Sequence, residues 1–159
     1  MDKTPLVLIL PNIRSAMNIG AIFRTADAVG AEKIYLCGYS ATPNHPKVAK
    51  TAIGAEETVP WEYIKETNQV INKVKNSGYQ IIGLEFNQRA EKIWETDFKF
   101  PIALIVGNEI HGIPEDQIEL CDKIIYLPML GKKESLNVAT ATGIASYNIL
   151  EKYLLASQN

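Results

Sequence analysis

Short apolar runs alternate along this chain with longer stretches of helical periodicity. Five runs have the length and composition of buried strands: residues 6–10, 33–37, 79–84, 101–106 and 123–127. Between them, apolar residues recur at helical intervals. We expect helices over residues 19–29, 48–53, 66–76, 114–120 and from 135 to about 155. Strands that alternate with helices predict an α/β fold with a mostly parallel sheet flanked by helices.

Length and composition fit one globular domain. The chain has 159 residues, of which 47% are hydrophobic and 21% charged, so it can bury a core of its own. It has no repeat, low-complexity tract or linker, and we expect residues 1–159 to form a single domain. The apolar run 6–10 is too short for a signal-peptide core, and no run approaches the roughly 20 residues of a membrane span. We therefore expect a cytoplasmic protein with no membrane segment.

The cysteines and histidines do not have the spacing of a metal site. Cys37 and Cys121 are too few for a disulfide framework, and each closes or adjoins an apolar segment, so we expect reduced, packed thiols. His45 and His111 are not spaced with the cysteines, or with each other, as metal ligands are. The sequence predicts no metal.

The charge balance argues against a broad surface for nucleic acid. Sixteen basic residues oppose eighteen acidic ones, which gives a net charge of −2. Binding along a polyanion usually needs a basic surplus, so any such site must be a local patch. Arginine is scarce, and two of the three arginines, Arg14 and Arg24, lie in or beside the first of three polar segments.

The first polar segment, residues 12–26, places hydrogen-bonding groups directly before a helix. The free N–H groups and partial positive charge of a helix N-terminus suit a phosphate or a sugar. Arg24 follows Gly20 by about one helical turn, so the two share a face, and Gly20 allows a close approach. The alternative is a capped helix that carries one solvated arginine.

The second polar segment, residues 105–114, leaves a buried strand through a loop bounded by Gly107 and Gly112. Ligands of open α/β sheets bind outside the carboxyl ends of the strands. The two glycines have the spacing of a phosphate-binding loop, but no Gly-Lys-Ser/Thr follows, and no Gly-x-Gly-x-x-Gly supports a nicotinamide cofactor. Glu109 can pair with a cation or accept hydrogen bonds from backbone N–H groups. His111 fits a loop residue better than a general base.

The third polar segment, residues 127–139, again joins a strand end to a helix. Ser135 is predicted to be the N-cap of that helix. Asn137 then falls in the first turn between two apolar residues, where a buried amide needs partners. Lys132 and Lys133 either contact phosphate or are solvated. Since all three segments border strand ends, we expect one polar constellation of Asn18, Arg24, Glu109, Ser135 and Asn137.

The three segments resemble the three motifs of the SPOUT superfamily of methyltransferases, in its SpoU (TrmH-like) branch of RNA ribose 2′-O-methyltransferases. The likeness runs in order over nearly the whole chain. Residues 18–26 resemble the first motif, 106–109 with Gly112 the second, and 127–129 with 135–139 the third. The resemblance implies methylation of a ribose 2′-hydroxyl in RNA with S-adenosylmethionine as methyl donor.

The resemblance also implies an architecture. It implies a C-terminal deep trefoil knot and a homodimer whose active site combines parts of both subunits. S-adenosylmethionine would bind in the knot, with its adenine in an apolar pocket. Carried over by position, its contacts are Leu84, Gly107, Leu127, Ser135 and Leu136.

The resemblance assigns catalytic or site-forming positions to Asn18, Arg24, Glu109, Ser135 and Asn137. The family mechanism is often written with this arginine as the base. A guanidinium is not normally deprotonated in proteins, so we expect Arg24 to hold the adjacent phosphate and stabilise the developing alkoxide. The candidates for RNA binding are Arg14, Lys132 and Lys133.

Several hypotheses about the substrate and the activity stay open. With no accessory RNA-binding domain expected, a small target such as a tRNA loop with unstacked nucleotides is favoured, and ribosomal RNA is the alternative. The alternative from a different class is a protein that keeps the fold and binds RNA but does not catalyse methyl transfer. Loss of Arg24 or Asn137 would indicate such a protein, and both residues are present. Methylation of a base or a protein is disfavoured, because the first motif resembles the ribose branch.

Overall fold

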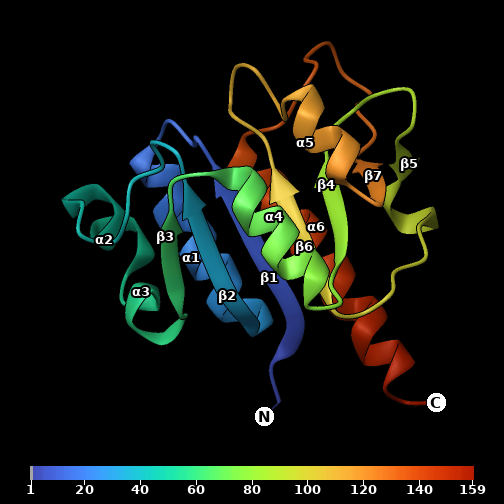
Figure 1. The fold of residues 1–159 in the computed structure, drawn as a ribbon, viewed down its shortest axis with the longest axis horizontal. Helices are drawn as coiled ribbons and strands as arrows, with labels where there is room; N and C mark the ends of the chain where they lie inside the picture. Colours follow the sequence, from blue (N-terminus) through green and yellow to red (C-terminus); the bar gives the residue numbers. More distant parts are fainter. Residues whose placement is uncertain (1) are drawn as a thin grey trace.

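The computed structural model describes residues 2–159, and its strands form one parallel sheet. The strands are β1 (Thr4–Pro11), β2 (Ala31–Cys37), β3 (Trp61–Ile64), β4 (Gln80–Leu84), β5 (Glu91–Lys92), β6 (Ile102–Val106) and β7 (Lys123–Tyr126). Their order across the sheet is β3-β2-β1-β6-β4-β7-β5. The predicted α/β fold with a mostly parallel sheet is confirmed, and the carboxyl ends of the strands lie at the upper edge in Figure 1.

Helices cover both faces of the sheet (Figure 1). They are α1 (Ala16–Val29), α2 (Pro46–Ala52), α3 (Ala55–Thr58), α4 (Thr67–Asn76), α5 (Glu115–Leu120) and α6 (Val138–Ala156), with one 3-10 turn, η1 (Ile93–Glu95). Helices α1 and α6 pack against each other on one face, with α2 and α3 beside α1, and α4 and α5 cover the opposite face. None of the helices within residues 2–159 has the length and apolar character needed to cross a membrane.

The central strand β1 shows why its sequence is almost continuously apolar. Leu6, Leu8 and Leu10 pack into the core on the α1 and α6 side, whereas Val7 and Ile9 pack into the core beneath α4. A strand buried on both faces needs apolar side chains at successive positions. The sheet can therefore hold the loops at its carboxyl edge on a rigid base.

Some elements differ from the sequence-based expectation. The edge strand β3 and the two-residue strand β5 were missed, because they are short and carry half-buried or exposed side chains. Helix α3 was missed because it has only four residues. Helix α1 begins at Ala16, three residues before the predicted start, since its N-cap is Ser15.

The start of the last helix was also predicted wrongly. The helix begins at Val138, and its N-cap is Asn137 rather than Ser135. The Asn137 side chain is exposed, and its Oδ1 accepts hydrogen bonds from the N–H groups of Ala139 (2.9 Å) and Thr140 (3.2 Å). Asn and Ser are equally good N-caps, so the sequence could not choose between them.

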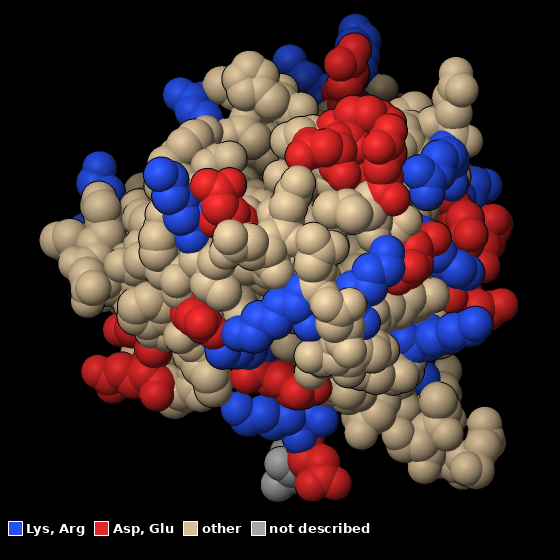
Figure 2. Space-filling model, viewed as in Figure 1, with Lys and Arg blue, Asp and Glu red and all other residues tan. Residues whose placement is uncertain are grey.

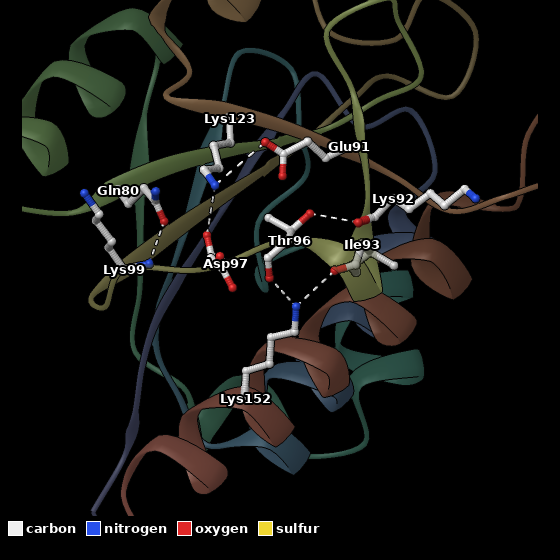
Figure 3. Close-up of polar contacts among 9 residues, drawn as sticks. All are labelled: Gln80, Glu91, Lys92, Ile93, Thr96, Asp97, Lys99, Lys123 and Lys152. Carbon is white, nitrogen blue, oxygen red and sulfur yellow. Dashed lines mark hydrogen bonds and ion pairs between the residues drawn. The ribbon is translucent and has the colours of Figure 1, made fainter. Parts of the chain in front are cut away.

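Two lysines tie the segment around η1 to elements that follow it in the chain (Figure 3). Lys123 of β7 donates to the carbonyl of Asp97 at 3.1 Å. Lys152 of α6 donates to the carbonyls of Ile93, at 3.2 Å, and Thr96. Burial lowers the pKa of Lys152. These contacts fix β7 and α6 to a segment that precedes β6; the deep trefoil knot itself stays a prediction.

Candidate active site

Helix α1 starts beside the carboxyl ends of β1 and β6, and Ser15 shapes its first turn. Ser15 has an extended backbone, and its Oγ accepts a hydrogen bond from the Asn18 N–H at 3.2 Å. An N-cap of this kind satisfies one of the N–H groups that a helix leaves without a partner. The donors that remain at this end need other acceptors.

The carboxylate of Glu109, in the loop after β6, supplies those acceptors. Its Oε1 accepts from the N–H of Arg14 at 2.8 Å, and its Oε2 accepts from the N–H of Ser15 at 2.9 Å and from Asn18 Nδ2 at 3.1 Å. Burial raises the pKa of Glu109, but these hydrogen bonds outweigh burial and hold it below its ordinary value. The sequence left open whether Glu109 pairs with a cation or accepts hydrogen bonds from backbone N–H groups. In the structure it accepts hydrogen bonds from backbone N–H groups.

Asn18 connects Glu109 to Asn137 in the third segment. Asn137 Nδ2 donates to Asn18 Oδ1 at 3.1 Å. This series of hydrogen bonds fixes the orientation of the Asn18 and Asn137 amides at both of its ends. At one end the ionised carboxylate of Glu109 can only accept, and at the other the N–H groups of α6 can only donate. Each amide has two N–H bonds, and the contacts among the described residues use one on each side chain. The structure thus joins the three polar segments through Asn18, Glu109 and Asn137.

Arg24 lies apart from this cluster. Its side chain is exposed and has no hydrogen bond or ion pair with another residue of the range 2–159. It lines an open depression of about 330 Å³ between α1, α2 and α6, together with Ala21, Thr25, Ala28, Thr51 and Tyr147. Of the five members of the expected constellation, Asn18, Glu109 and Asn137 are joined by hydrogen bonds within one chain, whereas Arg24 and Ser135 make no hydrogen bond with them among the described residues. The place of these two residues in the site stays a prediction.

Gly20 does allow a close approach, but the partner is helix α2. A Cβ at this position would lie 1.7 Å from Thr51 Oγ1 and 2.7 Å from the carbonyl oxygen of Val48. The glycine therefore brings α2 against α1 next to the depression that Arg24 lines.

The loop between β7 and α6 carries the remaining residues predicted from the third segment. Lys132, Lys133, Ser135 and Leu136 are all exposed. Within residues 2–159, no backbone group of residues 128–136 takes part in a protein hydrogen bond. A loop with so many free donors and acceptors is suited to hold a polar ligand through its backbone.

The predicted donor contacts Leu84, Gly107 and Leu127 lie at the ends of three neighbouring strands. Leu84 of β4 pairs with Val106 of β6 and with Ile125 of β7. All three predicted contacts are half-buried. A Cβ on Gly107 would lie 2.7 Å from the carbonyl carbon of Gly112, so Gly107 lets its loop fold back on itself.

Three residues that the sequence analysis did not select organise the same edge. Asn108 Nδ2 donates to the carbonyl of Asn12 at 2.8 Å and to the hydroxyl of Tyr39 at 2.7 Å. Asn108 Oδ1 accepts from the N–H groups of Ile110 and His111. The signal in the sequence was the pair of asparagines that follow β1 and β6, which are common in turns that need side-chain acceptors.

The two cysteines are packed in the core and are not reactive groups of this edge. Burial raises the pKa of Cys37 to about 11, against a hydrogen bond from Thr67, and burial raises the pKa of Cys121 to about 12. Both thiols are free and buried, which confirms the prediction of packed cysteines. Within residues 2–159, no group of three His, Cys, Asp or Glu side chains is placed to hold a metal ion.

Comparison with known proteins identifies the class of fold. The structure superposes on the AdoMet-bound rRNA methyltransferase from Sinorhizobium meliloti with a TM-score of 0.88, at 26% identity over 95% of this chain and 57% of that chain. Its architecture is that of the SpoU-type methyltransferases.

The sequence assigns the family. The pattern of the SpoU rRNA methylase family matches residues 5–147, and this chain belongs to that family. It is 33% identical over 152 residues to the 23S rRNA (guanosine-2'-O-)-methyltransferase of Ralstonia nicotianae, covering 96% of this chain and 61% of that relative. It is 34% identical over 145 residues to the tRNA (guanosine(18)-2'-O)-methyltransferase of Aquifex aeolicus, covering 89% of this chain and 67% of that relative. The chain thus spans about three fifths to two thirds of these relatives.

Proposed function

We propose that this chain transfers the methyl group of S-adenosylmethionine to a ribose 2′-hydroxyl in RNA. The observation that carries the proposal is the hydrogen-bonded chain Asn137–Asn18–Glu109, which joins the three segments that resemble the family motifs. The family assignment and the names of the two relatives support it.

The carboxyl ends of β4, β6 and β7 fit the methyl donor. Half-buried Leu84 and Leu127 offer apolar surface for an adenine, and residues 128–136 offer backbone donors and acceptors that no protein group uses among the described residues. Gly107, Ser135 and Leu136 complete the proposed contacts. S-adenosylmethionine, when bound, supplies a methyl group activated by its sulfonium. No residue here has to provide a metal for that chemistry.

In this proposal Glu109, Asn18 and Asn137 position the target nucleotide. The carboxylate of Glu109 holds the Asn18 amide, which in turn holds the amide of Asn137. The N–H bonds that these amides leave unused are donors of fixed direction for ribose or phosphate oxygens. Holding the 2′-hydroxyl in line with the methyl group contributes a large part of the rate of such a transfer.

We assign Arg24 to the active site of a partner subunit in a homodimer. Its separation from Glu109 within one chain supports this assignment. Arg24 belongs to a stripe along the outer face of α1 that adjoins an exposed apolar part of α6. The stripe consists of Met17, Ala21, Arg24 and Ala28, and the adjoining α6 residues are Ile144 and Tyr147. Met17 is 57% exposed and Tyr147 53% exposed, so a second copy of the chain would cover apolar surface there.

Delivered across this interface, the Arg24 guanidinium holds the phosphate next to the target ribose. A guanidinium binds a phosphate through two parallel hydrogen bonds, and its charge stabilises the oxyanion that develops as the hydroxyl loses its proton. Because the guanidinium stays protonated, the hydroxyl proton passes to solvent water as the bond from the ribose oxygen to the methyl group forms and the bond from sulfur to the methyl group breaks.

Mixing two inactive variants tests this arrangement. Arg24→Ala and Asn137→Ala are each expected to abolish transfer while leaving donor affinity within a few-fold. In a mixed dimer, one of the two sites then has neither substitution, so a random mixture regains about a quarter of wild-type activity. If Arg24 acted within its own chain, every site would carry a defect and no activity would return.

As substrate we propose tRNA. The charges of the protein support a small area of contact with RNA. The chain has a net charge of −2, and the face in Figure 2 bears an acidic cluster over α5, made of Glu115, Asp116 and Glu119. Phosphates are repelled there, so RNA contacts concentrate at the exposed Arg14, Lys132 and Lys133. A tRNA loop with splayed nucleotides fits such a short edge.

Ribosomal RNA is the second candidate, favoured by the Ralstonia relative, which is named for 23S rRNA. Transfer of labelled methyl to tRNA and rRNA fractions from cells that lack the gene separates the two. We expect label in tRNA; label in rRNA alone would contradict this part of the proposal. Label in neither, with RNA still bound, would favour the non-catalytic role.

A further inference from the structure

Tyr39, the second residue after β2, presents an ordered aromatic ring at the carboxyl edge of the sheet. The side chain is 60% exposed, yet both ends of the residue are held. Its N–H donates to Asn12 Oδ1 at 3.0 Å, and its hydroxyl accepts from Asn108 Nδ2 at 2.7 Å. The ring is therefore held at both ends while most of the residue stays open to solvent.

Two residues with left-handed backbone shape the turn that holds this ring. Asn12 has φ +52°, which asparagine tolerates better than most residues with a side chain. Gly38 has φ +61°, and a Cβ there would lie 1.9 Å from Asn12 Oδ1, so this position requires glycine. The hydroxyl of Tyr63 braces the same turn by donating to the Gly38 carbonyl at 2.6 Å.

The position of the ring relates it to the proposed active site. Asn108, which holds the Tyr39 hydroxyl, directly precedes Glu109 in the loop after β6. Asn108 also donates to the carbonyl of Asn12, two residues before the exposed Arg14. The ring therefore belongs to the same hydrogen-bonded edge as the Glu109 cluster and lies on the β1–β2 side of it, away from the strands proposed for the methyl donor.

We propose that the ring of Tyr39 is a stacking platform for an unpaired base of the RNA next to the target ribose. The proposal rests on the function proposed above. A nucleotide whose 2′-hydroxyl is to be reached must leave the stack of its neighbours, and aromatic side chains commonly replace that lost stacking. The ring pre-ordered by Asn12 and Asn108 loses little conformational entropy when a base packs on it.

Binding of fluorescein-labelled oligoadenylate and oligouridylate to the full chain, with S-adenosylmethionine present, tests the proposal. Tyr39→Leu keeps apolar bulk but removes the ring, and Tyr39→Phe keeps the ring but removes the hydroxyl. Trp94→Leu is the matched control, because Trp94 is 57% exposed but lies in η1, next to the far edge strand β5. Donor affinity and thermal unfolding of each variant are measured beside the RNA affinity.

We expect Tyr39→Leu to weaken oligoadenylate binding at least about fivefold, the lower limit for loss of one base stack. Tyr39→Phe keeps the ring and loses only the contact with Asn108, so it should weaken binding less than Tyr39→Leu does. Trp94→Leu should stay within about twofold of wild type, with donor affinity unchanged in all three. Wild type should prefer oligoadenylate to oligouridylate, since purines stack more strongly, and Tyr39→Leu should reduce this preference. The salt dependence of RNA affinity should become weaker in Arg14→Gln, which removes a charge that can neutralise a phosphate. It should not change in Tyr39→Leu, because stacking neutralises no phosphate.

Unchanged RNA affinity in Tyr39→Leu would overturn the proposal, as would a loss in Tyr39→Phe equal to that in Tyr39→Leu. The wild-type base preference is measured without any substitution, so a variant that fails to fold does not remove the test. Methyl transfer by wild type is scored separately. Transfer with no effect of Tyr39→Leu would contradict the stacking role alone, whereas binding that depends on Tyr39 without any transfer would contradict the proposed activity. Wild-type protein that binds no RNA would overturn both.

Discussion

Replacing Glu109 by alanine removes the acceptor that links the first two polar segments. The substitution deletes three hydrogen bonds, from the N–H groups of Arg14 and Ser15 and from Asn18 Nδ2. Bonds to a charged acceptor contribute more than neutral ones, but this site is half-exposed and water can replace part of them. We therefore use the stabilisation that a helix cap typically contributes and expect the free energy of unfolding to fall by about 1–2 kcal/mol. For a domain of this size, that lowers the melting temperature by roughly 2–8 °C.

The catalytic loss should exceed what this modest loss of stability accounts for. Without Glu109, the Asn18 amide is held only by its contact with Asn137, so turnover should fall at least about tenfold through lost positioning. Donor affinity should stay within a few-fold. Calorimetry and single-turnover transfer measure the two effects, with the exposed Glu119→Ala as control.

A double-mutant cycle tests the connection itself. Because Asn18 joins Glu109 to Asn137, the stability effects of Glu109→Ala and Asn137→Ala should deviate from additivity by at least about 0.5 kcal/mol. An unchanged melting temperature in Glu109→Ala, or strict additivity in the double variant, would refute the reasoning.

Three further predictions follow from the same contacts. The lowered pKa of Glu109 means that its ionised form stabilises the fold. The stability advantage of wild type over Glu109→Gln should therefore be full near neutral pH and vanish as pH falls through that pKa. Urea unfolding along a pH series measures this advantage, and a difference that stays constant with pH would contradict the prediction. Gly20→Ala should destabilise by about 1–3 kcal/mol, because its Cβ would collide with Thr51; calorimetry showing equal or higher stability would oppose this. Cys37 and Cys121 should resist iodoacetamide at pH 8 until the chain unfolds; mass spectrometry that finds rapid native labelling would disprove their protection.

The fold was predictable where burial dictates the residues. The five apolar runs became β1, β2, β4, β6 and β7, because strands covered on both faces need apolar side chains at successive positions. Strands β3 and β5 lie at the two edges of the sheet, where that requirement lapses and half-exposed residues such as Glu62 are tolerated. Their pairing depends on neighbours far away in the sequence, which local pattern does not encode.

The site was predictable in its polar residues but not in their grouping. Asn18, Glu109 and Asn137 meet as expected, because each lies in a segment that follows the carboxyl end of a strand. Arg24 does not join them, and helix geometry explains why: six residues turn the chain by about 240° around the axis, so Asn18 and Arg24 point to different sides. Tyr39 was missed because loop–loop hydrogen bonds hold it, and no periodic pattern marks such contacts.

The central claim is methylation at a ribose 2′-hydroxyl, and the most direct test is to identify the methylated nucleoside. RNA from cells that lack the gene is incubated with the protein and labelled S-adenosylmethionine, digested to nucleosides and analysed by mass spectrometry. Our account predicts label in a 2′-O-methylnucleoside, which is lost when a single 2′-hydroxyl of a synthetic substrate is replaced by hydrogen. Label on a base, or no transfer by protein that binds the methyl donor, would contradict it.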